Sequence, residues 1–165
     1  MRLASALPAL FVALAACHDS TAPRPSALVS VTNRDIVATR SGADPTPLFG
    51  FSIPVTIRNT GFTTLSYGGC LFVVEQSTIA GWHPVWNPPC YVLDWAGPVT
   101  ILPGQSITMN LSVASALGDT PSYVPWGAPT VDGTYRVSFA LDVGGSGVAS
   151  NSITVSSNSF ALHLQ

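Results

Sequence analysis

The sequence is poor in charge. It contains no lysine and a single glutamate, Glu75, and six arginines supply all of its positive side-chain charge. Charged residues make up 8 % of the 165-residue chain, against about 25 % in a typical soluble domain. With a formal net charge of -2, the chain lacks the basic surface that attracts nucleic acid. We therefore expect no nucleic-acid partner.

The motifs of the common catalytic and metal sites are also missing. The chain has no Gly-x-Ser-x-Gly elbow, no His-Glu-x-x-His helix, no phosphate-binding loop and no Asp-x-Asp calcium run. Of three histidines, His18 and His163 lie near the two ends, which leaves His83 as the one candidate for a site. A lone histidine beside a proline is usually a solvated structural residue. We therefore expect a protein that is not an enzyme and that uses no cofactor or metal.

What the chain does have is an apolar beginning. Residues 1–16, MRLASALPALFVALAA, place one arginine before an apolar stretch, which is the outline of a secretory signal peptide. This stretch is shorter than the roughly 17–25 residues that a membrane-spanning helix needs. The sequence therefore predicts export rather than a permanent transmembrane helix.

The next residue gives the signal peptide its type. Leu14-Ala15-Ala16-Cys17 resembles the lipobox of bacterial lipoproteins, and that resemblance implies cleavage before Cys17 and acylation of this cysteine. Two or three acyl chains on one residue anchor a protein stably to a bilayer. The resemblance thus implies a lipid-anchored protein of the bacterial cell envelope, and His18 in place of aspartate favours the outer membrane. The alternative is an ordinary secreted protein in which Cys17 is incidental.

Two further regions follow the signal peptide. Residues 17–27 are polar and carry prolines without any apolar period, so they predict a tether between the lipid and a folded domain. From 28 to 165 the apolar residues alternate, as in Phe51, Ile53, Val55 and Ile57, which is typical of half-buried strands. Pro54, on the opposite face, indicates a sheet edge or a bulge.

The domain is predicted to be all-β. About 7–9 short strands with frequent turns and no crossover helix favour an antiparallel, immunoglobulin-like β-sandwich. The apolar positions shift from odd to even numbers after Val155, which predicts a break or bulge near Ser156-Ser157. Asp132-Gly133-Thr134-Tyr135 has the form of a tyrosine corner, in which the hydroxyl bonds back to the preceding loop. Alternatively, Tyr135 only fills the core.

Two cysteines remain in the exported part, Cys70 and Cys90. An even pair in an oxidising compartment usually forms a disulfide. Such a bond would close a loop that contains Trp82, His83 and Trp86. The alternative is a pair of buried free thiols.

Several segments together resemble one known family. They are Ile53–Gly61, Gly81–Trp86, Leu102–Ser106 and Gly133–Val137, and they look like the immunoglobulin-like domain of BsuPI-type bacterial proteinase inhibitors. The resemblance spans most of the domain. It implies an immunoglobulin-like fold and, as an alternative function, protease inhibition through an exposed loop.

Large aromatic residues are the remaining lead to function. Aromatic side chains in rigid loops provide contact area at low entropic cost. We therefore expect a membrane-anchored module that binds an envelope protein through loops or sheet edges. A second alternative is a carbohydrate-binding module in which Trp82 and Trp86 stack on glycans. The candidate binding residues are Trp82, His83, Trp86, Tyr91, Tyr123 and Trp126.

Overall fold

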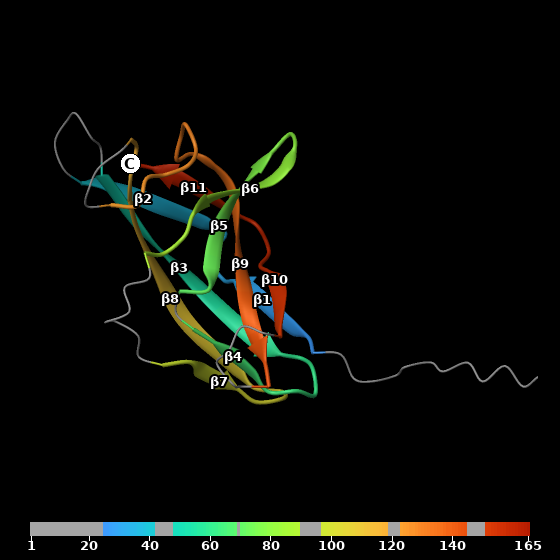
Figure 1. Cartoon of the computed structure of the whole chain (residues 1–165). Coiled ribbons are helices and arrows are strands. Elements are labelled where there is room, and N and C mark those ends of the chain that lie inside the picture. The colour runs from blue at the N-terminus through green and yellow to red at the C-terminus, as the bar shows by residue number, and fades with distance from the viewer. Residues whose placement is uncertain (1–24, 42–47, 69, 90–96, 119–122, 145–150) are drawn as a thin grey trace, which may run out of the picture.

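The computed structural model describes residues 25–41, 48–68, 70–89, 97–118, 123–144 and 151–165. These residues form strands and no helix, in agreement with the predicted all-β fold (Figure 1). The strands are β1 (Ala27–Val31), β2 (Asp35–Ser41), β3 (Leu48–Asn59), β4 (Leu65–Tyr67), β5 (Phe72–Thr78), β6 (Gly81–Trp86), β7 (Val99–Ile101), β8 (Ser106–Ala116), β9 (Gly133–Val143), β10 (Ser152–Ser156) and β11 (Phe160–Leu164).

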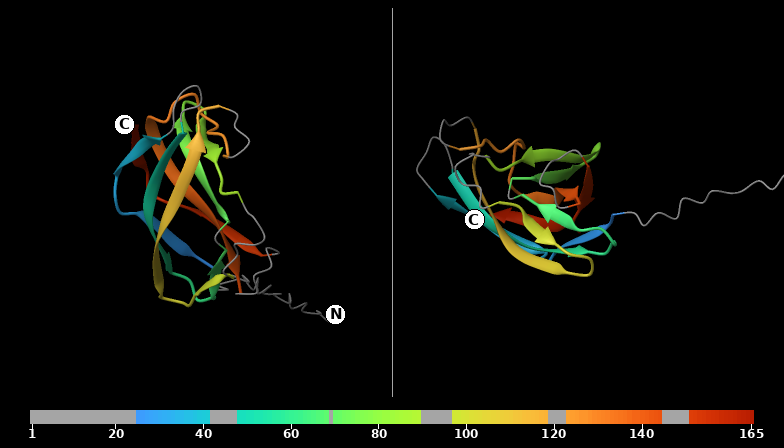
Figure 2. Two further views of the ribbon diagram at one scale, coloured as in Figure 1. Left: turned by 90° about the vertical axis from the view of Figure 1, so that its left-hand side faces the viewer. Right: turned by 60° about the horizontal axis from the view of Figure 1, so that its bottom comes forward.

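The strands form two layers of one curled sheet (Figure 2). In the first layer β3 lies between β1 and β8, with antiparallel pairing on both sides. In the second layer β9 is central and pairs with β4, β5, β10 and β11. Strand β2 joins the layers, because it pairs antiparallel with β3 and parallel with β11. The fold is therefore a sandwich that is antiparallel except at one strand pair.

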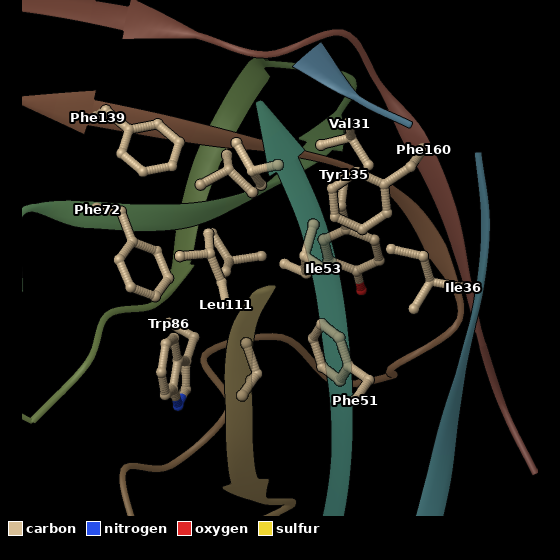
Figure 3. Packing of buried hydrophobic residues seen from close by; sticks show 14 of the residues in the cluster. Val31, Ile36, Phe51, Ile53, Phe72, Trp86, Leu111, Tyr135, Phe139 and Phe160 are labelled. Atoms are coloured by element: carbon tan, nitrogen blue, oxygen red, sulfur yellow. The ribbon is translucent and has the colours of Figure 1, made fainter. Parts of the chain in front are cut away.

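Alternation of apolar residues explains which faces meet in the core. The odd-numbered residues of β3 from Phe49 to Ile57 are buried, and so are the odd-numbered residues of β9 from Tyr135 to Leu141. Figure 3 shows side chains of the two layers meeting in the core, with Ile53 and Leu111 from the first layer and Phe72 and Phe139 from the second. Burial of apolar area at roughly 25 cal/mol per Å² is the main force that holds the two layers together.

The break predicted near Ser156-Ser157 is confirmed. Strand β10 ends at Ser156, and β11 begins at Phe160. Both strands pair with the same side of β9. Ser156 pairs with Ser138 and Phe160 pairs with Tyr135, so the segment between β10 and β11 holds one residue more than the matching segment of β9 and shifts the register by one. The shift lets Phe160 and Leu162 point into the core.

Two details differ from expectation. The described residues form eleven strands in place of the predicted 7–9, because part of the expected disulfide-bounded loop forms β6 and because Val99–Ile101 forms β7. Pro54 lies in a central strand rather than at an edge or a bulge, opposite Asn110 of β8. It is tolerated there because its carbonyl faces the end of β1, where it accepts a hydrogen bond from the Thr32 amide. The amide hydrogen that Pro54 lacks would have pointed toward β1 at the position where the pairing of β1 with β3 ends, so no hydrogen bond within the sheet is lost.

Candidate binding surface

The β5–β6 hairpin projects from one end of the sandwich (Figure 1). Its turn is short, with Thr78 directly opposite Gly81. Gly81 has a positive φ of 111°, a conformation that glycine adopts without steric cost. The Thr78 hydroxyl accepts a hydrogen bond from the Ala80 amide and donates one to the Gly81 carbonyl. These bonds fix the turn and leave Ile79 fully exposed at its tip.

One face of this hairpin continues onto β9. We call it the hairpin face and define it as Glu75 and Ser77 of β5, Trp82 of β6, and Arg136 and Ser138 of β9. Ser77 lies opposite Trp82 on the neighbouring strand, and Glu75 lies opposite Arg136. Side chains at paired positions share a face of the sheet, so strand pairing alone brings this set together.

An ion pair and a cation–π contact position the side chains of Glu75, Arg136 and Trp82 on the hairpin face. Arg136 Nε donates a hydrogen bond of 2.7 Å to Glu75 Oε2. The guanidinium carbon of the same arginine lies 4.6 Å from the centre of the Trp82 ring, within the range of a cation–π interaction. One side of the indole is therefore occupied by Arg136, and 37 % of the Trp82 residue remains exposed.

Hydroxyl groups extend this network across the sheet. Ser138 Oγ donates to the same oxygen of Glu75, and it lies 2.7 Å from Ser156 Oγ of β10. Burial opposes ionisation of the Glu75 carboxyl, but the hydrogen bonds from Arg136 and Ser138 and the arginine charge outweigh it. Together they lower the pKa of Glu75 below its ordinary value. The only glutamate of the chain is therefore a charged structural member of this surface.

A groove of about 350 Å³ adjoins the hairpin face at Ser138. Strands β5, β9 and β10, the residues just before β5 and the residue just after β6 provide its walls, and most of its lining is apolar. Its size and chemistry suit an apolar side chain of a partner more than a charged group. The lining residues are Cys70, Leu71, Phe72, Val73, Asn87, Ser138, Phe139, Ala140 and Thr154.

The edge of β6 is a poorer binding site than its face. Within the described part of the chain, β6 pairs only with β5. Pro84 lacks an amide hydrogen, and the register shifts between Val74 and Glu75 as at a β-bulge. The Val85 carbonyl already accepts a hydrogen bond of 2.8 Å from the Gly127 amide. Proline, bulges and covering loops all hinder addition of a further strand.

Two of the proposed binding residues are buried, so that expectation was wrong for them. Trp86 is 4 % exposed and lies against Phe72 (Figure 3), with the two ring centroids 5.8 Å apart. Trp126 is 5 % exposed and meets Phe49 and Phe51 edge-on. Both rings belong to the core because the sandwich closes over them, and neither contributes to an exposed patch.

The remaining candidates divide between the surface and regions outside the description. His83 is exposed on β6, one residue from Trp82. Tyr123 is 39 % exposed in the segment before β9. Tyr91, Cys90 and Cys17 lie outside the described residues. The Cys70–Cys90 disulfide and the acylation of Cys17 therefore stay predictions.

The tyrosine corner is present. The Tyr135 ring is fully buried, and its hydroxyl donates a hydrogen bond of 2.9 Å to the Val131 carbonyl. The same hydroxyl accepts a hydrogen bond of 2.9 Å from Gln76 Nε2 of β5. Burial raises the pKa of Tyr135 to about 12. This residue ties the loop before β9 to the base of the projecting hairpin.

The described residues contain no group of three or more His, Cys, Asp or Glu side chains that could hold a metal ion. They also contain no helix long and apolar enough to cross a membrane. Of the two histidines in the described ranges, His83 lies on β6 beside Trp82 and His163 lies on β11.

Comparisons with known proteins give no family. No family model matches the chain, and no curated protein matches it. A protein described as ApaA from Bordetella pertussis shares 15 % identity over 85 % of this chain and 94 % of its own, with a TM-score of 0.44. A second structural-genomics target shares 12 % identity over 86 % of both chains, also with a TM-score of 0.44. A β-glucosidase from Listeria innocua shares 10 % identity over 87 % of this chain and 17 % of its own, with a TM-score of 0.36. These likenesses are too weak to bear on function.

Sequence reasoning found Trp82 but missed its partners. Arg136 and Glu75 are 61 positions apart, and no local pattern connects them. The available signal was indirect: each is a charged residue at an outward position of an alternating strand. Only the β5–β9 register places them opposite each other.

Proposed function

We propose that this chain is a lipid-anchored protein of the bacterial cell envelope whose sandwich binds a protein partner through the hairpin face. The observation that carries the binding role is the exposed Trp82 ring, which Arg136 and Glu75 hold in place. Tryptophan and arginine are the side chains most enriched among residues that dominate binding energy. The absence of enzymatic motifs from the sequence supports a binding role over a catalytic one.

Order in the free protein favours binding. An immobilised side chain costs roughly 0.5–1.5 kcal/mol when a complex forms. Arg136 already bonds to Glu75 and packs on Trp82, so part of that cost is met during folding. The adjoining groove offers a place for an apolar side chain of the partner, while Ser138 supplies a hydroxyl group in its lining.

Site-specific crosslinking tests the binding role. A photoreactive amino acid at Ser77, which is exposed on the hairpin face, is compared with one at Thr108 on the outside of the other layer. In intact cells we expect a discrete adduct from position 77 and none from position 108. Adding Trp82→Ala to the position-77 protein is expected to abolish that adduct. Equal labelling from both positions, or labelling that survives Trp82→Ala, would contradict the proposal.

The anchoring role rests on the lipobox resemblance at Cys17 and is tested separately. The intact protein is extracted from bacterial membranes and its mass is measured. We expect a mature chain that begins at Cys17 and carries acyl groups, with a mass two hydrogens lower than that of the reduced form if Cys70 and Cys90 are bonded. An uncleaved and reduced chain would remove both the anchor and the disulfide from the proposal.

Protease inhibition is a second candidate, because Ile79 stands fully exposed on a fixed and projecting turn. An inhibitory loop should block a protease stoichiometrically and resist cleavage itself, and Ile79→Asp should abolish the inhibition. A panel of proteases that remains uninhibited by the wild-type protein would exclude this function.

Carbohydrate binding has less support. Trp86 is buried and cannot stack on a glycan together with Trp82, so Trp82 alone offers one open ring face.

A further inference from the structure

The end of the sandwich opposite the β5–β6 hairpin carries exposed apolar side chains. They lie around the start of β1, where the N-terminal segment enters the fold. We call it the end surface and define it as Leu28, Arg58, Phe62 and Leu102. Leu28 is 60 % exposed, Phe62 78 % and Leu102 48 %. Single exposed apolar residues are ordinary. Here three of them share one end of the molecule.

Strand pairing and hydrogen bonds show that the segments which carry these residues are neighbours. Leu28 of β1 lies opposite Arg58 of β3. The turn that carries Phe62 is joined to the turn after β7, because Asn59 Nδ2 donates to the carbonyls of Thr63 and Ile101. Leu102 directly follows Ile101, so it lies beside the Phe62 turn.

The Phe62 turn is fastened by hydrogen bonds to Asn59. Asn59 is fully buried, and its side-chain oxygen accepts a hydrogen bond of 3.0 Å from the Gly61 amide. The backbone amide of Asn59 donates a hydrogen bond to the Gln105 carbonyl, and the backbone carbonyl of Asn59 accepts one from the Gly104 amide. With these groups satisfied, the turn holds Phe62 outward in the folded state instead of letting it collapse onto the core.

The N-terminal segment joins the fold at this same end. The Ser26 carbonyl accepts hydrogen bonds of 3.0 Å from the amides of Thr60 and Gly61, and its hydroxyl lies 2.6 Å from that of Thr60. Strand β1 begins at Ala27, so the tether predicted to run to residue 27 ends by Ser26. Figure 1 shows the described chain beginning at the end away from the β5–β6 hairpin.

We propose that the end surface rests on the lipid bilayer, with Phe62 and Leu102 in the headgroup region. This inference rests on the proposed anchoring at Cys17. Residues 18–25 would then span roughly 15 Å as a flexible coil and at most about 30 Å when extended, which keeps the end surface within reach of the headgroups. A phenylalanine and a leucine beside an arginine match the chemistry of an interfacial surface.

Charge supports the same occupant. None of the described residues 26–30, 58–64 and 101–106 is aspartate or glutamate, while Arg58 is exposed among them. Anionic headgroups attract such a surface and would repel an acidic one. Seated in this way, the domain directs the hairpin face and Ile79 away from the membrane, toward partners in the surrounding compartment.

Quenching by brominated lipid tests this placement. The full acylated chain is reconstituted into vesicles of phosphatidylethanolamine and phosphatidylglycerol with brominated acyl chains. Phe62→Trp is compared with Ile79→Trp, because both positions are exposed tips of turns at opposite ends of the molecule. We expect the added emission of Phe62→Trp to be quenched several-fold more strongly than that of Ile79→Trp. Unchanged urea midpoints serve as the control for folding.

The two proposals fail in different ways in this experiment. If neither variant floats with the vesicles, the anchoring at Cys17 is wrong, and the placement of the end surface falls with it. If both variants float but the two added tryptophans are quenched equally or not at all, the anchor stands and the placement is overturned. In that case the end surface is left to bind a protein.

Discussion

Replacing Tyr135 by phenylalanine isolates one hydroxyl in the centre of the fold. The ring packs against Trp126 at a centroid distance of 5.6 Å and against Phe160 at 6.2 Å, and Tyr135→Phe leaves these contacts in place. The substitution removes the hydrogen bond to the Val131 carbonyl and the one from Gln76 Nε2. Its effect therefore measures the hydrogen bonds of this one hydroxyl, the corner bond to Val131 among them.

The expected loss of stability follows from those two bonds. A neutral hydrogen bond contributes about 0.5–1.5 kcal/mol net, and a buried group left without a partner costs more. Val131 is buried, so its carbonyl loses a partner that water cannot readily replace. Gln76 is only partly buried and can turn to solvent. We expect Tyr135→Phe to lower the free energy of unfolding by about 1–2 kcal/mol.

Urea unfolding at pH 7 provides the assay. Tyr123→Phe is the matched control, because Tyr123 is 39 % exposed and is not one of the buried core residues. We expect a lower midpoint for Tyr135→Phe at an unchanged slope, and no shift for the control. A change at position 135 below about 0.3 kcal/mol, well under the range for one hydrogen bond, would refute the reasoning and leave Tyr135 as core filling.

Four further outcomes are expected. Because its pKa is lowered, Glu75 stabilises the fold above its ordinary pKa of about 4.5 and loses this effect as the pH falls through its folded value; Glu75→Gln should therefore destabilise at pH 7 and flatten the acid limb of urea midpoints. The pKa values of Tyr67 and Tyr135 are raised to about 12, so stability should fall as the pH rises from about 10 to 12, and absorbance at 295 nm should show late-titrating tyrosines. Trp126→Ala should cost about 3–5 kcal/mol in thermal or urea unfolding, because it opens a cavity among aromatic rings; a loss under about 1 kcal/mol would contradict its burial. Cys70→Ser should cost roughly 3 kcal/mol if the predicted disulfide exists, and two titratable thiols in the oxidised domain would disprove that bond.

Local pattern was a good guide to the strands and their inward faces. The alternation in β3 and β9 and the phase shift before Phe160 are properties of short windows, because side chains on a strand alternate with a period of two. The tyrosine corner was also readable, since Val131 and Tyr135 are four residues apart. The same local reasoning failed at β6, where a loop closed by the Cys70–Cys90 disulfide was expected and pairing with β5 makes a strand.

The candidate site depends on contacts between residues far apart in the chain, which no short stretch of sequence reveals. Three tryptophans in similar sequence surroundings differ in exposure. Trp82 lies on the surface against Arg136, whereas Trp86 and Trp126 are buried between the two layers. Arg136 meets Glu75 only because β5 and β9 are neighbours in the sheet. The end surface likewise unites β1, the turn after β3 and the turn after β7.

The sequence by itself determined the all-β class, the alternating core positions, the break between β10 and β11 and the scarcity of charge, because each is set by side-chain identity within a few residues. The tertiary structure alone decided which aromatic rings are exposed, which outward charges meet and which turns share an end of the molecule. Those features depend on contacts between segments that are distant along the chain, and such contacts form only when the two layers pack and fix the strand order.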